Sequence, residues 1–186
     1  MRLPGATHRV ITCRTEAEAQ AALADAQRVL VQLDVQWHPQ KTRIVHIHRG
    51  FEFLGYKIKQ GRPRAALRRK LGRSAPAGTI YAYPREKSIE RFKEQIRQRT
   101  KRRIPLPTEQ IIAEINPILQ GWGQYYKRSR LRKLFTHLDA WIVRRLWSQR
   151  CKHWRCEGWK QLPQTKLYGE MKLVSLLKLH LLARSP

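Results

Sequence analysis

Apolar residues in the middle of the chain recur at intervals of three and four, which is the spacing of one face of an α-helix. They are Ile111, Ile115, Ile118, Leu119, Trp122, Tyr125 and Tyr126. The pattern predicts a central helix that has Thr108 as its N-cap and bends at Pro117. Gly121 and Gly123 each cost about 1 kcal/mol relative to alanine inside a helix. We therefore expect another backbone, of a helix or of a nucleic acid, to approach closely beside Trp122.

Three further segments have helical periodicity, at residues 16–33 after an N-cap at Thr15, at residues 85–101 and at residues 131–154. Their expected inward residues are Ala19, Leu23, Ala26, Leu30 and Leu33 in the first, Ile89, Phe92 and Ile96 in the second, and Leu131, Leu134, Phe135, Leu138, Trp141, Ile142, Leu146 and Trp147 in the third. Residues 171–183 predict a short docking helix. The helices from residue 85 onward are typical of a bundle.

Strands are predicted before the bundle. Residues 9–15 are rich in branched side chains, residues 42–48 alternate, and residues 51–58 alternate again. We expect the last two segments to pair with each other. The predicted fold class is therefore α+β, with a strand–helix–hairpin unit (1–58), a basic connector (59–84), a bundle of three main helices (85–156) and a tail containing a short apolar helix (157–186).

The charge of the chain indicates its partner. There are 39 Lys and Arg residues against 13 Asp and Glu residues, for a formal net charge of +26. Self-repulsion on that scale favours a polyanionic partner, so nucleic acid is preferred over anionic lipid or a ribosomal-type structural role. No segment is apolar over the length that a bilayer requires, and the first residues lack the apolar run of a signal peptide. The three cysteines, Cys13, Cys151 and Cys156, are an odd number and form no even disulfide framework. We therefore expect a reducing, cytoplasmic location.

Two strings in the sequence resemble a known family. I-N-P-I-L-Q-G-W-G-Q-Y-Y, followed by F-T-H-L-D-A-W-I-V-R-R-L-W, resembles the maturase-specific (X, or thumb) segment of group II intron-encoded reverse transcriptases. K-T-R-I-V followed by F-E-F-L-G-Y is similar to the end of the palm of the same enzymes. The resemblance implies a helical thumb, and it places Lys41 near an incoming nucleotide. It also implies that F-L-G-Y forms a hairpin that contacts the primer through Phe53, Leu54, Gly55 and Tyr56. Read as one strand, Phe53 and Tyr56 would lie on opposite faces, so at least one would be core.

The chain departs from that family where the catalytic aspartates of Y-A-D-D would stand. Thr7 and His8 occupy those two positions, immediately before the segment that begins at Arg9. Magnesium requires hard oxygen ligands, which neither a threonine nor a neutral histidine replaces. We expect no catalytic residues, no metal site and no cofactor in this chain, with Mg²⁺ needed only in an intact or reassembled polymerase. Cys151, His153 and Cys156 lack the second ligand pair of a structural zinc site.

Clusters of cations are the predicted RNA-binding residues, because unneutralised positive charge at helix ends and in acid-free segments favours phosphate contact. They are Arg62, Arg64, Arg68, Arg69 and Lys70 in the connector, Lys127, Arg128, Arg130, Arg132 and Lys133 before the third bundle helix, and Arg144 and Arg145 within it. The helical spacing of Trp122, Tyr125 and Tyr126 favours core packing over base stacking. Trp154 and Trp159 are freer to stack on bases.

Three interpretations of the sequence stay open. The chain is an RNA-binding module that recognises structured intron RNA and assists splicing, with polymerase activity lost. Alternatively, it is half of a split RNA-directed DNA polymerase, active only with an upstream partner chain. In the third interpretation it is a non-functional remnant of a mobile element, prone to aggregate through uncovered strand edges.

Overall fold

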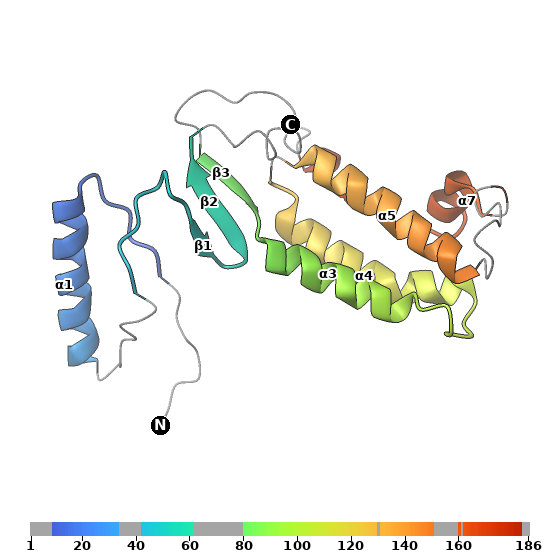
Figure 1. Ribbon diagram of the computed structural model, residues 1–186, viewed down its shortest axis with the longest axis horizontal. Helices are drawn as coiled ribbons and strands as arrows, with labels where there is room; N and C mark the ends of the chain where they lie inside the picture. Colours follow the sequence, from blue (N-terminus) through green and yellow to red (C-terminus); the bar gives the residue numbers. More distant parts are fainter. Residues whose placement is uncertain are drawn as a thin grey trace.

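The computed structural model describes residues 9–33, 42–61, 80–129, 131–150, 160 and 162–183. Within these ranges the fold is α+β, as predicted, with a three-stranded antiparallel sheet before a helical bundle (Figure 1). The helices are α1 (Glu16–Gln32), α3 (Glu86–Arg99), α4 (Thr108–Tyr126), α5 (Arg132–Arg150), α7 (Gln164–Gly169) and α8 (Leu176–Leu182). The strands are β1 (Phe51–Phe53), β2 (Tyr56–Gln60) and β3 (Ile80–Pro84).

The sheet has the order β1-β2-β3 and differs from the predicted one. β1 and β2 form a hairpin inside the segment that was expected to be a single strand. Leu54 and Gly55 have φ angles of 45° and 79°, and two such residues in succession make the tight turn that suits the twist of a hairpin. Because the chain reverses there, Phe53 and Tyr56 pair directly and share one face, so their expected placement on opposite faces is wrong.

The third strand was not predicted, because residues 80–84 fall in the predicted basic connector (59–84). β3 pairs with β2 over its whole length, from Gln60↔Ile80 to Tyr56↔Pro84. It therefore takes the position beside the hairpin that was expected for residues 42–48. Residues 42–48 and 9–15 contain no strand, and both predictions are wrong. The middle of the predicted connector, residues 62–79, lies outside the described residues.

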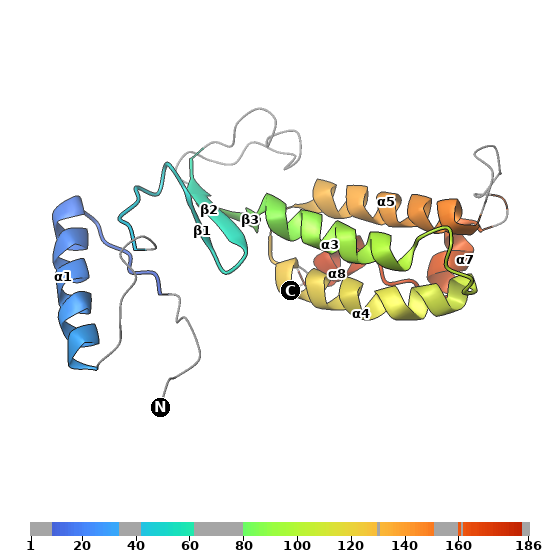
Figure 2. The same cartoon turned by 60° about the horizontal axis from the view of Figure 1, so that its bottom comes forward.

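The bundle consists of α3, α4 and α5, whose apolar faces form one core, and Figure 2 shows the three helices lying lengthwise against each other. The periodicity predicted this core well. Its buried members on these helices are Phe92, Ile96, Ile111, Ile112, Ile115, Leu119, Tyr126, Phe135, Leu138, Ile142, Val143 and Leu146. Trp122 is partly buried and packs against it, with ring centroids 4.6 Å from Phe92, 4.7 Å from Tyr126 and 5.9 Å from Phe135. The core interpretation of Trp122 is confirmed.

Two details of α4 differ from expectation. Pro107 is the N-cap, and Thr108 is the first helical residue, with no side-chain capping bond. The fixed φ of Pro107, −63°, starts the helix without one. Tyr125 is 50% exposed, since it points from the edge of the helix toward the hairpin.

Helix α8 packs on α4 at Gly123. A Cβ atom there would lie 2.7 Å from Leu179 Cδ1 and 3.0 Å from Leu176 Cδ2, so any larger residue would require these leucine side chains to move. A second helix does approach at Gly123, but the atoms nearest to it belong to leucine side chains and not to the backbone that was expected. At Gly121 no heavy atom lies within 4 Å of an added Cβ.

Two polar side chains of the bundle hold α8 and the segment before it. Asp139 of α5 accepts hydrogen bonds from Ser175 Oγ (2.8 Å), Leu176 N (2.9 Å) and Leu177 N (3.0 Å). Asn116 of α4 donates to the carbonyl of Lys172 (3.0 Å) and accepts from Val174 N (2.9 Å). The predicted docking helix is therefore present, and the buried Asp139 together with the half-buried Asn116 fixes its position.

Helix α1 begins as predicted, with the Thr15 hydroxyl accepting a hydrogen bond from Glu18 N at 3.2 Å. The prediction of a buried face on α1 is wrong, because none of its residues is buried. Figures 1 and 2 show α1 apart from the bundle, on the far side of the sheet. Of its predicted inward residues, Ala19, Leu23, Ala26 and Leu30 are only half-buried and Leu33 is exposed.

Candidate nucleic-acid interface

The hairpin turn is fastened to the C-terminal end of α4 by tyrosines. Tyr125 Oη donates to the carbonyl of Leu54 (2.6 Å) and Tyr126 Oη to that of Gly55 (3.2 Å). In return, Tyr56 Oη donates to the carbonyl of Tyr125 in a short hydrogen bond. A Cβ on Gly55 would lie 2.7 Å from Tyr126 Oη, so the contact also requires glycine.

The same hairpin carries the four residues that the resemblance assigned to primer contact, which stays a prediction. Gly55 and Tyr56 are engaged with α4, and Phe53 is half-buried. Leu54 is 55% exposed and is the one of the four whose side chain stays open to solvent. Burial, followed by the neighbouring Tyr125 and Tyr126, raises the pKa of Tyr56. Lys41 lies outside the described residues.

The predicted basic link between α4 and α5 forms a compact turn. Ser129 N bonds to the carbonyl of Tyr126 (2.9 Å), and His180 Nδ1 of α8 lies 2.6 Å from the carbonyl of Lys127. Lys127 Nζ donates to Gln124 Oε1 at 2.7 Å. The exposed cations here are Arg128, Arg132 and Lys133. Arg130 and the connector cations Arg62, Arg64, Arg68, Arg69 and Lys70 lie outside the described residues.

The two predicted cations of α5 have different environments. Arg144 is exposed, with its Nε bonded to the carbonyl of Ala140 (3.2 Å). Arg145 is half-buried and bonds to the end of α3, from Nε to Thr100 Oγ1 (3.1 Å) and from Nη2 to the Thr100 carbonyl (3.0 Å). Burial, and then the positive charges of Arg97 and Arg102, lower the pKa of Arg145. Arg145 thus joins two helices in addition to contributing charge.

Sequence reasoning missed cations on α3 and in the link that follows it. Lys93 Nζ and the guanidinium carbon of Arg97 each lie 5.8 Å from the ring centroid of Trp141 on α5. Arg102 Nε donates to Ser148 Oγ of α5 (3.2 Å). The sequence does indicate these cations, because residues 97–103 contain no acid. The cations of this run are Arg97, Arg99, Lys101, Arg102 and Arg103. We call Lys93, Arg97, Arg102, Arg144 and Arg145, together with Trp141, the α3/α5 basic face.

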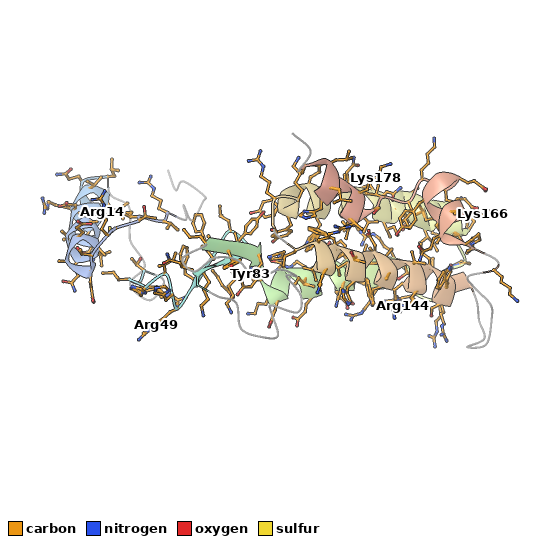
Figure 3. All side chains as sticks on the ribbon, turned by 90° about the horizontal axis from the view of Figure 1, so that it is seen from above. Arg14, Arg49, Tyr83, Arg144, Lys166 and Lys178 are labelled. Carbon is orange, nitrogen blue, oxygen red and sulfur yellow. The ribbon has the colours of Figure 1, made fainter. Side chains whose placement is uncertain are left out.

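Figure 3 shows Arg144 on the opposite side of the bundle from Lys166 and Lys178. The bundle therefore carries cations on both sides, and those of α7 and α8 are not part of the α3/α5 basic face. Among the described residues no group of three or more His, Cys, Asp or Glu side chains could hold a metal ion. Cys151, His153 and Cys156, and the possible stacking residues Trp154 and Trp159, lie outside those residues.

These features define a strongly basic α+β protein whose main body is a helical bundle with a small sheet fastened to one end. Residues 89–167, from α3 to α7, match the family model described as group II intron, maturase-specific domain. This region is therefore a group II intron maturase C-terminal region, as the resemblance predicted. No curated protein matches the chain. In the described part of the chain no helix has the length and apolar character needed to cross a membrane.

Proposed function

We propose that this protein binds structured group II intron RNA and thereby assists splicing, without polymerase activity of its own. The observation that carries the proposal is the maturase-specific domain at residues 89–167 in a chain with a net charge of +26. Cationic side chains neutralise phosphates that crowd together where RNA folds back on itself. Binding to the compact form would then shift the RNA toward its splicing-competent fold.

A salt titration tests RNA binding. Intron RNA is expected to bind with an affinity that falls by a factor of about 10³ or more between about 50 and 200 mM salt, as for six or more phosphate contacts. Filter binding at a series of salt concentrations measures the slope. A self-splicing assay at low magnesium, with and without protein, then measures how much the protein increases splicing. An affinity that does not change with salt would refute the proposal.

A second candidate function is supported by α1. Val29, Val31 and Leu33 are 51%, 79% and 63% exposed, and Val10 and Ile11 before the helix are also exposed. Such an uncovered apolar surface fits half of a split RNA-directed DNA polymerase that is completed by another polypeptide. The interpretation as a non-functional remnant predicts the same surface but no cooperative unfolding.

Primer extension distinguishes the split polymerase from the RNA-binding module. A complementary chain that supplies the Y-A-D-D aspartates is mixed with this protein, and each chain is also assayed alone. Extension by the mixture, but by neither chain alone, is the expected result for the split enzyme. Absence of extension together with salt-dependent RNA binding supports the binding module.

A further inference from the structure

The α3/α5 basic face has an arrangement that the charge pattern alone did not reveal. Trp141 packs against the bundle core with part of its surface, while Lys93 and Arg97 lie over the ring. An aromatic ring that is covered in this way is not available to stack on a base. Unstacked bases of single strands are normally held on open aromatic rings. The Trp141 ring therefore offers no open surface on which the bases of a single strand could stack, although the face is positively charged.

The cations of this face are also held in place. Arg145 is bonded to Thr100, and Arg102 to Ser148. Arg144 lies between Trp141 and Ser148 on the same side of α5, because residues three and four apart on a helix are neighbours. Fixed cations lose less conformational freedom on binding than freely moving side chains do.

The dimensions fit a polyanionic backbone. Residues 141 to 148 of α5 span about 10 Å at a rise of about 1.5 Å per residue. Over that length one strand of an RNA duplex carries about three or four phosphates, at roughly 3 Å per phosphate along its axis. Glu94 is the acid that bonds within this face, where it pairs with Arg97 at 3.3 Å while its side chain is 54% exposed. The charge of the face is therefore predominantly unneutralised.

We propose that the α3/α5 basic face binds the phosphate backbone of double-helical RNA without reading its sequence. The inference rests on the proposed RNA-binding function and adds the surface, the form of RNA and the mode of contact. Trp141 acts as a positioning residue, which holds Lys93 and Arg97 toward the phosphates and does not touch a base.

The main experiment compares two variants that each lose three positive charges. Arg97→Gln/Arg102→Gln/Arg144→Gln changes the α3/α5 basic face, and Lys166→Gln/Lys172→Gln/Lys178→Gln changes α7, α8 and the segment between them. Binding of the full chain to a perfect RNA duplex is measured against salt. The first variant is expected to lose about 100-fold or more in affinity at about 0.1 M salt. Its slope of log affinity against log salt concentration is expected to be smaller in magnitude by about 3. The control variant is expected to change the slope by less than about 1.

A gain-of-affinity variant tests the same face without relying on a loss that misfolding could also cause. Glu94→Gln releases Arg97 from an exposed ion pair and is expected to tighten duplex binding by between about 1.5- and 5-fold. Unfolding cannot produce that result. Duplexes of unrelated sequence and equal length are expected to bind alike, and more tightly than either of their single strands.

The possible failures can be distinguished. If the wild-type affinity depends steeply on salt but the two triple variants lose the same amount, this inference is overturned and the proposed RNA binding stands. Tighter binding of single strands than of duplexes also overturns it. A flat salt response of the wild-type protein overturns the proposed function itself.

Discussion

Asp139→Ala is expected to lower the free energy of unfolding by about 4 kcal/mol, because it removes a carboxylate that accepts three hydrogen bonds. Asp139 is 8% exposed, and the amide of Leu176 that it accepts is buried. Without the carboxylate, the first amides of α8 are left without an acceptor in the core. Burial raises the pKa of Asp139, and the three hydrogen bonds oppose this shift.

Urea denaturation measures the loss, and hydrogen exchange at the amides of Leu176 and Leu177 locates it. Those amides are expected to lose protection before the rest of the bundle does. Asp25→Ala is the matched control: its carboxylate pairs with Arg28 at 3.0 Å on the exposed surface of α1, so the change should stay below about 0.5 kcal/mol. A change at Asp139 no larger than at Asp25 would contradict the capping role.

Trp122→Ala is expected to cost about 3 to 5 kcal/mol, as for other large-to-small changes in a core. The indole contacts Phe92 of α3, Tyr126 of α4 and Phe135 of α5, so its loss opens a cavity where three helices meet. Since domains of this size are stable by roughly 5 to 15 kcal/mol, the variant should be close to unfolding. Thermal and urea denaturation followed by circular dichroism measure the effect.

Trp122→Phe separates packing from RNA contact. The indole Nε1 is buried and has no hydrogen-bond partner among the described residues, so phenylalanine gives up no such bond. We expect a loss of about 1 to 1.5 kcal/mol in stability and unchanged RNA affinity. Stacking on a base would instead contribute about 1 to 3 kcal/mol to binding. A folded Trp122→Phe protein with RNA affinity reduced by about tenfold or more would therefore refute the core interpretation.

The bundle was the part that the sequence predicted best, and the reason is local periodicity. Ile111, Ile115 and Leu119 repeat at helical spacing, and all three are buried. The maturase-specific part of the family resemblance rested on the same region and was confirmed there, whereas its palm part stays a prediction. The charge likewise indicated a polyanionic partner, but it did not distinguish the exposed Arg144 from Arg145, which joins α5 to the end of α3.

The sheet was predicted poorly because strand pairing is decided between distant segments. Residues 42–48 alternate as a strand should, yet the partner of β2 is β3, which follows it by some twenty positions in the sequence. The alternation of residues 51–58 predicts one continuous strand, and only the family resemblance pointed to a hairpin at Leu54 and Gly55. The helical pattern of α1 also did not show whether its apolar side is buried, because that depends on which other surface packs against it.

The sequence by itself determined the helices of the bundle, their buried faces, the family of residues 89–167 and the excess of positive charge. Periodicity and composition are properties of neighbouring residues, so they can be read along the chain. Only the tertiary structure decided that Tyr125 and Tyr126 fasten the hairpin, that Asp139 caps α8, and that Lys93 and Arg97 cover Trp141. Each of these contacts joins residues that are far apart in the chain, and their meeting depends on how the helices pack.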